Sequence, residues 1–203
     1  MKKIQSLYNG ELEISSYRGR KILDGASVNL SYGSVHGIWR RGLKNVLTDR
    51  CKHILLLGLG GGSVISILRD ELFYKGMITA VELDPVVIKI AATEFGIRNN
   101  SVQKIIEDNA FDFIHDTKKK YDLILCDVFI ESKVAPEVFT PEFWNAIDEI
   151  LSGGGKIIVN VSTSAKQVNK CRSLMEREKE RFRFYLIQKA GGSNTLIKAT
   201  KKN

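Results

Sequence analysis

From Lys52 onward, short unbroken apolar runs alternate with segments of helical periodicity. Strands that a parallel sheet buries on both faces form continuous apolar runs rather than alternating ones. Alternation of such strands with helices is typical of an α/β fold, in which helices cover both faces of the sheet. The runs predicted as strands are His53–Leu57, Met77–Glu82, Val102–Ile106, Asp122–Asp127 and Lys156–Val161.

Apolar residues at three- and four-residue intervals predict helices between these strands. Pro85 and Pro141 stand where first-turn prolines belong. The glycine run 153–155 is predicted to end the last of these helices and to turn the chain into the next strand. The predicted helices are Ser63–Phe73, Pro85–Phe95, Ala110–Asp116 and Pro141–Leu151.

A basic helix and two further strands are predicted after the last parallel strand. The helix covers about Ala165–Glu180, and the strands are Phe182–Lys189 and Asn194–Ala199. Gly191 and Gly192 separate the two strands and indicate a β-hairpin that closes the sheet. The predicted fold is therefore a Rossmann-like α/β sheet of seven strands, mostly parallel, with a C-terminal hairpin.

The first fifty residues follow a different pattern. Leu12–Ser16 and Lys21–Leu23 are short strand-like pieces, broken by turns at Gly19 and Gly25. The chain has 203 residues, slightly more than the roughly 150 of a single domain. We therefore expect a small N-terminal β-segment over residues 1–50 and one main domain over residues 51–203.

The formal charge of +8 and the pI near 9.4 raise the question of nucleic-acid binding. Lysine and arginine concentrate in residues 118–120, 166–183 and 198–202. Such runs are typical of solvated helix faces and chain ends. A nucleic-acid partner is therefore possible but not favoured.

Cysteine usage and hydropathy exclude several other classes. Cys51, Cys126 and Cys171 are widely spaced and form no C-x-x-C pair, so neither a disulfide framework nor a zinc site is indicated. The N-terminal lysines precede no apolar run of a signal peptide. No stretch approaches the roughly 18 apolar residues of a membrane span. We expect a cytoplasmic protein without a membrane segment and without a metal.

A glycine cluster is the strongest local motif. Gly58, Gly60 and Gly62 form a G-x-G-x-G turn directly after a buried strand and before a helix. Glycine admits backbone angles closed to other residues and lets a ligand approach the main chain. The dinucleotide fingerprint needs a glycine at Ser63, and no Gly-Lys-Ser/Thr of a P-loop follows. An ordinary tight turn is the alternative.

Acidic residues follow three neighbouring predicted strands. Glu82 ends the second strand, where Rossmann-type sites place the carboxylate that binds ribose hydroxyls. Asp108 and Asn109 follow the third, either to bind an adenine amino group or to cap a helix. Asp127 ends the fourth, as an acid/base beside a ligand or as a turn cap. Because the carboxyl ends of parallel strands meet at one edge, Asp127 and the glycine loop should face one crevice.

The segments LLLGLGGGS, AVELDP, EDNAFDF, YDLILCDVF and LSGGGKIIV, in this order and spacing, resemble the spermidine synthase family of class I S-adenosylmethionine-dependent transferases. The resemblance covers about residues 6–161 and includes SLYNGELEI, ILDG and SYGSVHGIW of the N-terminal segment. It implies the class I methyltransferase fold and, as cofactor, S-adenosylmethionine or its decarboxylated form, with no metal.

The resemblance also implies residue roles. It makes Asp127 the catalytic acid/base. The cofactor-binding residues that it implies are Gly58, Leu59, Gly60, Gly62, Glu82, Leu83, Asp108, Asn109, Ala110 and Asp127.

Two departures from the family bear on the reaction. The family's loop carries an aspartate after its glycines, where residues 61–63 are Gly-Gly-Ser, and its Asp-Ser-x-Asp-Pro segment is Asp-Val-Phe-Ile-Glu at 127–131. A unit charge about 4 Å from a carboxylate is worth about 4 kcal/mol at an effective dielectric near 20, so the two losses should weaken binding of a diamine. Residues 128–130 predict an apolar pocket wall, and Glu131 is a candidate replacement carboxylate.

We therefore predict transfer of a methyl or related alkyl group to a small-molecule acceptor, an amine being one candidate. One alternative is a polyamine aminopropyltransferase that uses the decarboxylated cofactor. Another, motivated by the charge, is a nucleic-acid methyltransferase or RNA-binding module, although Cys126–Phe129 lacks the Asn/Asp-Pro-Pro-aromatic segment of base-amino methylases. The last alternative is a nucleotide-binding scaffold that has lost catalysis. Monomer and homodimer both remain open.

Overall fold

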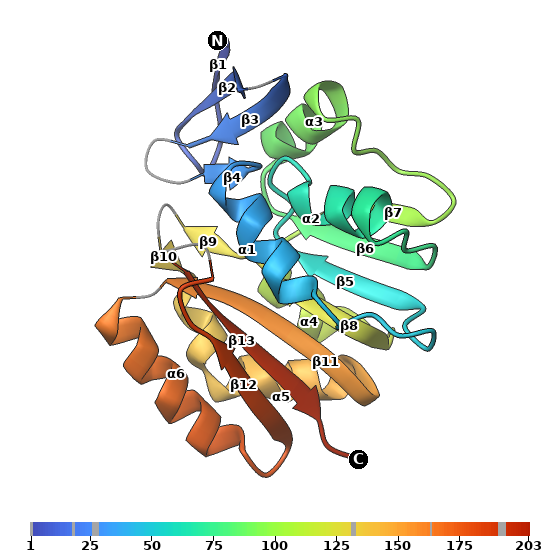
Figure 1. Ribbon diagram of the computed structural model, residues 1–203, viewed down its shortest axis with the longest axis vertical. Helices are drawn as coiled ribbons and strands as arrows, with labels where there is room; N and C mark the ends of the chain where they lie inside the picture. Colours follow the sequence, from blue (N-terminus) through green and yellow to red (C-terminus); the bar gives the residue numbers. More distant parts are fainter. Residues whose placement is uncertain (1, 18, 26–28, 131–132, 163, 191–193) are drawn as a thin grey trace.

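The computed structural model describes residues 2–17, 19–25, 29–130, 133–162, 164–190 and 194–203. A seven-stranded sheet forms its centre (Figure 1). The strands are β5 (His53–Leu57), β6 (Met77–Glu82), β7 (Gln103–Glu107), β8 (Tyr121–Cys126), β11 (Leu151–Ser162), β12 (Phe182–Ile187) and β13 (Asn194–Lys201).

The strand order is β12-β13-β11-β8-β5-β6-β7. The strands from β11 to β7 pair in parallel, and β13 runs antiparallel between β11 and β12. The predicted fold, with its C-terminal hairpin, is thereby confirmed; Gly191 and Gly192 lie outside the described residues. The order reverses between β5 and β8, and such a switch point is where open α/β sheets bind ligands.

Helices cover both faces of the sheet. One layer holds α1 and α2 to α3, the other α4 to α6, and alternate residues of β5 enter the two cores. Buried Trp144 and Phe143 anchor the second layer. The helices are α1 (Ser34–Leu43), α2 (Ser63–Ser66) with a π-helical turn (Ile67–Glu71), α3 (Pro85–Glu94), η2 (the 3-10 helix Pro136–Phe139), α4 (Ala110–Asp116), α5 (Pro141–Ile150) and α6 (Ala165–Glu178).

Two predicted helix ends are wrong. The helix predicted over Ser63–Phe73 turns into a π-helix and ends at Glu71, and Phe73 has a left-handed φ of 51°. The glycine run 153–155 does not end a helix. Helix α5 stops at Ile150, and β11 already pairs with β8 at Leu151; the glycines occupy the register shift that follows, as a bulge in the strand.

The N-terminal segment forms a four-stranded antiparallel sheet at one end of the molecule (Figure 1). Leu12 and Leu23 of this sheet pack on Val87 and Ile90 of α3. The two predicted strand pieces lie in β2 and β3, whereas β1, β4 and helix α1 were not predicted. The strands are β1 (Lys2–Gln5), β2 (Glu11–Tyr17), β3 (Arg20–Asp24) and β4 (Asn29–Ser31).

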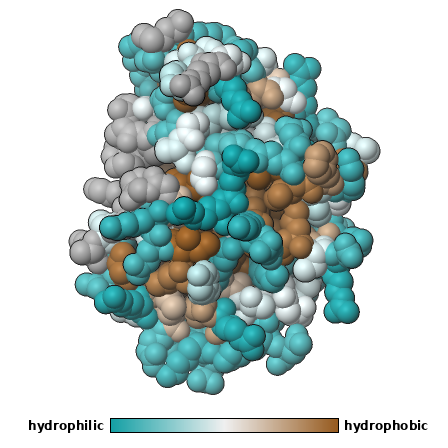
Figure 2. Space-filling view, in the orientation of Figure 1, coloured by the Kyte–Doolittle hydropathy of each residue, from teal (hydrophilic) through white to brown (hydrophobic). Residues whose placement is uncertain are grey.

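The basic runs lie largely on the surface. Lys118, Lys119 and Lys120 are exposed, as are Arg172 and Arg177 on α6. On the face shown in Figure 2, hydrophilic residues cover most of the surface and apolar ones show between them. The lysine and arginine side chains named above are thus exposed to solvent, as the charge pattern predicts.

Asp84 ties the N-terminal sheet to the main sheet. The Asp84 Oδ1 atom accepts the Val86 N–H at 2.9 Å and so caps α3. Its Oδ2 atom accepts the Ser6 hydroxyl, the Asn9 amide at 3.2 Å and the Tyr8 N–H at 3.4 Å. Burial opposes ionisation, but these donors outweigh it and lower the pKa of Asp84. The carboxylate thereby holds the turn after β1 against the end of β6.

Asp84→Asn should lower the free energy of unfolding by about 1–3 kcal/mol at pH 7, because donors around Oδ2 lose their acceptor. The folded-state pKa of Asp84 is lowered, so its contribution is complete above the unfolded value of about 3.9 and disappears as the pH falls through the folded value. The difference from wild type should therefore narrow in acid.

Urea unfolding at pH 7 and at an acidic pH near the unfolded pKa of about 3.9 measures this difference in the free energy of unfolding. Asp112→Asn, at an exposed position on the first turn of α4, is the matched control and should change stability by less than about 0.5 kcal/mol. Equal unfolding free energies of wild type and Asp84→Asn at pH 7 would contradict the stabilising role of the Asp84 hydrogen bonds.

Candidate active site

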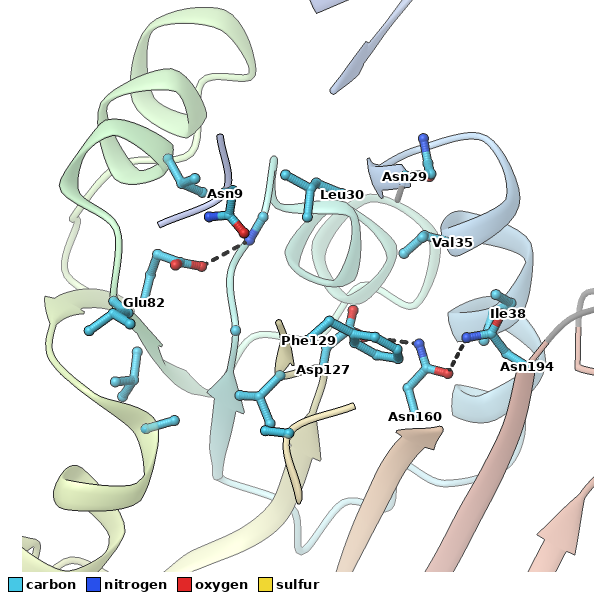
Figure 3. A pocket seen from close by; sticks show the side chains of 18 of the residues that line it. Asn9, Asn29, Leu30, Val35, Ile38, Glu82, Asp127, Phe129, Asn160 and Asn194 are labelled. Carbon is cyan, nitrogen blue, oxygen red and sulfur yellow. Dashed lines mark hydrogen bonds between the residues drawn. The ribbon is translucent and has the colours of Figure 1, made fainter. Parts of the chain in front are cut away.

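A cavity of about 460 Å³ opens where β5 and β8 end, at the switch point (Figure 3). It is lined by the glycine loop, by the ends of β6, β8, β11 and β13, by α1 and by the N-terminal segment. Of the predicted cofactor residues, Leu59, Gly62 and Asp108 are not among the described lining residues, and their cofactor roles stay predictions. Those that line the cavity are Gly58, Gly60, Glu82, Leu83, Asn109, Ala110 and Asp127.

The glycine loop is wedged between two backbones. Gly58 and Gly60 have left-handed φ angles of 87° and 52°. A Cβ on Gly58 would lie 2.5 Å from the carbonyl oxygen of Asp127, and a Cβ on Gly60 would collide with the carbonyl oxygen of Leu30 in β4. The glycines are therefore needed both for packing and for an open main chain beside the cavity.

Glu82 holds the loop in this position. The Glu82 Oε2 atom accepts the N–H groups of Leu59 at 2.9 Å and Gly60 at 3.3 Å, and Oε1 accepts that of Asp84 at 3.1 Å. Burial raises the pKa of Glu82, while the three backbone donors act against the rise. A carboxylate has about four acceptor sites, so these three donors leave capacity for a ligand hydroxyl.

Asn109 caps helix α4. The Asn109 Oδ1 atom accepts the N–H of Phe111 at 2.8 Å, so the helix-cap interpretation of this segment is confirmed for Asn109. The Asp108 carboxylate accepts the N–H of Asn109 at 2.8 Å. Asn109, the N-cap of α4, and Ala110, its first residue, line the cavity.

Asp127 is held from two sides. The Asp127 Oδ2 atom accepts the indole N–H of Trp39 in α1 at 2.7 Å, and Oδ1 accepts the Nδ2 of Asn160 in β11 at 2.9 Å. Asn160 Oδ1 in turn accepts the Nδ2 of Asn194 at 2.9 Å (Figure 3). Burial raises the pKa of Asp127, and the donors Asn160 and Trp39 oppose the rise.

Trp39, Asn160 and Asn194 were missed by the sequence analysis. One signal was available for Asn160, which is a single polar residue within the apolar run Ile157–Val161 and is only 2% exposed. A buried polar side chain needs hydrogen-bond partners, so its place in a core strand indicated a partner near the strand end.

The cavity is acidic although the chain is basic. Its charged side chains, among the described lining residues, are Glu82, Asp127 and Glu137, with no lysine, arginine or histidine beside them. Val128 and Phe129 also line it, which confirms an apolar wall at those two positions. Glu131 lies outside the described residues. Such a lining favours a ligand that is cationic and partly apolar.

Within the described part of the chain, no group of three or more His, Cys, Asp and Glu side chains is placed to hold a metal ion. No helix there is both long and apolar enough to cross a membrane.

Fold and cavity together define a Rossmann-like protein of the class I methyltransferase architecture. The solved structure of a probable spermidine synthase from Corynebacterium glutamicum matches with a TM-score of 0.81 at 17% identity, over 99% of this chain and 79% of that one. Human methyltransferase-like protein 13 in complex with SAH matches with a TM-score of 0.64 at 22% identity, over 84% and 80%. These likenesses concern the fold.

The family is identified by sequence. Residues 42–188 match the spermine/spermidine synthase domain, and the chain belongs to this family. The polyamine aminopropyltransferase of Vibrio vulnificus is 33% identical over 118 residues, covering 57% of this chain and 39% of the relative. The eEF1A lysine and N-terminal methyltransferase of Bos taurus is 30% identical over 132 residues, covering 59% and 19%. The chain thus matches less than half the length of these relatives.

Gly60→Ala should destabilise the fold more than Gly96→Ala. Gly96 also has a left-handed φ, 71°, but a Cβ there would meet nothing within 4 Å, so its variant should lose only about 1–2 kcal/mol from backbone strain. Gly60→Ala adds the collision with Leu30, which we expect to cost about 1–3 kcal/mol more. Urea unfolding measures both variants, and equal losses would disprove the wedge.

Proposed function

We propose that the chain transfers a methyl or related alkyl group from the sulfonium of S-adenosylmethionine to a small amine, with Asp127 as the base. The observation that carries this proposal is one acidic cavity at the switch point, bounded by the glycine loop, Glu82 and Asp127. Membership of the spermine/spermidine synthase family supports an amine acceptor, and it supports aminopropyl transfer, the second candidate below, more directly than methyl transfer. A positively charged sulfonium and an amine acceptor both suit the acidic lining.

The residues present fit an adenosyl cofactor. Gly58 and Gly60 present an open main chain to the cavity, and the Glu82 carboxylate beside them retains acceptor capacity for ribose hydroxyls. Asn109 and Ala110 line the part of the cavity next to α4. The cavity volume lies within the roughly 300–1,000 Å³ of small-molecule sites. When bound, S-adenosylmethionine supplies a carbon made electrophilic by its attachment to a sulfonium.

Asp127 is suited to remove a proton from the acceptor. An amine is mostly protonated at neutral pH and becomes a nucleophile only after it loses a proton. Burial raises the pKa of Asp127 above its ordinary value, which makes the carboxylate a stronger base. Holding amine and cofactor in line supplies much of the remaining acceleration.

The space beside the glycine loop favours methyl over aminopropyl transfer. A Cβ on Gly61 would lie 2.5 Å from the Cβ of Ser31. The Ser63 hydroxyl is bonded to Ser31 Oγ at 3.0 Å and accepts the Tyr32 N–H at 2.6 Å. This part of the loop therefore offers no carboxylate. The ammonium group of decarboxylated S-adenosylmethionine would lack an ion-pair partner there, and such a partner is worth about 4 kcal/mol at an effective dielectric near 20. In S-adenosylmethionine the carboxylate of the amino acid part balances the charge of its ammonium group, so this donor does not need a protein carboxylate there.

Aminopropyl transfer to a polyamine is the second candidate. The name of the Vibrio vulnificus relative supports it directly, and Glu137 places another carboxylate at the cavity for a second ammonium. The acidic lining disfavours a third candidate, a nucleic-acid acceptor, because phosphates would be repelled there.

Asp127→Asn should reduce kcat by about 10²–10⁴-fold, because the base is lost while its shape is kept. Affinity for S-adenosylhomocysteine, measured by calorimetry, should stay within about threefold. Turnover is followed as S-adenosylhomocysteine release over a panel of mono- and diamines, with Asp112→Asn as the control. Unchanged kcat in Asp127→Asn would exclude the assigned role.

The donor should be S-adenosylmethionine rather than its decarboxylated form, with kcat/KM at least about tenfold higher, or about 1.4 kcal/mol. Mass spectrometry of the amine products separates methyl from aminopropyl addition. Gly61→Asp combined with Ser31→Gly, which removes the nearest clash and leaves the Phe95 ring 3.1 Å from the new Cβ, should move the preference toward the decarboxylated donor. An aminopropyl product from putrescine with the wild-type protein would establish the second candidate instead.

A further inference from the structure

Asn160 links the carboxylate of Asp127 to the C-terminal hairpin. Its side chain is buried at the end of β11, between Asp127 and the first residue of β13, Asn194. Asn160 donates through Nδ2 to Asp127 and accepts through Oδ1 from Asn194, each at 2.9 Å (Figure 3). The three side chains thus form a directed chain of hydrogen bonds from β13 to the cavity.

The direction of this chain is favoured at both of its ends. A side-chain amide has a donor end and an acceptor end of nearly equal shape, and a half-turn exchanges them. Turned around, Asn160 would place Oδ1 against the Asp127 carboxylate, and two acceptors would face each other. The acceptor-only carboxylate of Asp127 disfavours this arrangement at one end of the Asn160 amide, and the Nδ2 of Asn194, which donates to Asn160 Oδ1, opposes it at the other. The Trp39 indole carries a donor and no acceptor, so its hydrogen bond to Asp127 needs no second residue to select its orientation.

We propose that Asn194 is a positioning residue that holds the Asn160 amide with its donor end toward Asp127, so that the Asp127 carboxyl group accepts hydrogen bonds from both sides at the cavity. This inference rests on the function proposed above for Asp127. It also gives the C-terminal hairpin a part in the site: β13 brings Asn194 to the cavity, 34 residues after Asn160.

Few other charges surround Asp127. Cys126 precedes it, and burial raises the pKa of that thiol to about 12, so it is neutral. Glu82 from β6 and Glu137 from η2 line the same cavity, and among the described lining residues α1, β11 and β13 contribute no charged group. The hydrogen bonds from Asn160 and Trp39 are therefore the main local forces that keep the pKa of Asp127 from rising further with burial.

The test is a pH titration of the Asp127 carboxyl by ¹³C NMR, with the signal assigned through Asp127→Asn. In Asn194→Ala the midpoint should rise, by at most about one unit, the value of a hydrogen bond to a charged group, because Asn160 then points Nδ2 at Asp127 for less of the time. Asn160→Leu should raise it at least as much. In the Asn160→Leu background, Asn194→Ala should add nothing further, because Asn194 acts through Asn160.

Asn29→Ala is the matched control. Asn29 lines the same cavity but donates to Asp24 at 2.7 Å, so its loss should leave the Asp127 midpoint unchanged. Should Asn194→Ala not fold, Asn194→Asp replaces it; this variant turns the Asn160 amide around and should also raise the midpoint, but not in the Asn160→Leu background beyond the direct effect of the added charge.

A wild-type midpoint in Asn194→Ala, or an equal shift with and without Asn160, would overturn the proposal. The titration needs neither cofactor nor turnover. The positioning role and the transferase function can therefore fail independently: lack of turnover with any donor would refute the function alone.

Discussion

The site depends on the close approach of the glycine loop to its neighbours. Gly58 lies against the carbonyl group of Asp127 and Gly60 against that of Leu30, distances that no side chain would allow. The Glu82 carboxylate stabilises the loop by accepting hydrogen bonds from the N–H groups of Leu59 and Gly60. This close packing thus sets three things at once: the end of β5, the placement of β4 and the position of Asp127.

This arrangement gives the N-terminal sheet a role beyond packing. Asp84 fixes the turn that brings Asn9 to the cavity, and β4 fills the space beside Gly61 with Ser31. In the family that this chain resembles, an aspartate follows the loop glycines. Here Ser31 of β4 occupies the space that a side chain at Gly61 would need.

The sequence predicted the central sheet well because buried parallel strands carry continuous apolar runs. His53–Leu57 and Met77–Glu82 match β5 and β6 at both ends. Helix α1 escaped prediction because Gly37 interrupts its apolar pattern, and the glycines of the bulge at 153–155 resembled a helix stop. At the site, strand ends identified Glu82 and Asp127. The contact of Asp127 with Trp39 joins residues 88 apart, and no local pattern encodes such a contact.

The central claim is that the hollow between the glycine loop and Asp127 receives an adenosyl group. A crystal structure of the protein with S-adenosylhomocysteine tests it most directly. We expect the nucleoside beside Gly58 and Gly60, its ribose at Glu82 and its sulfur toward Asp127. A saturating concentration that leaves this hollow without the nucleoside, or a nucleoside bound elsewhere on the chain, would contradict the account.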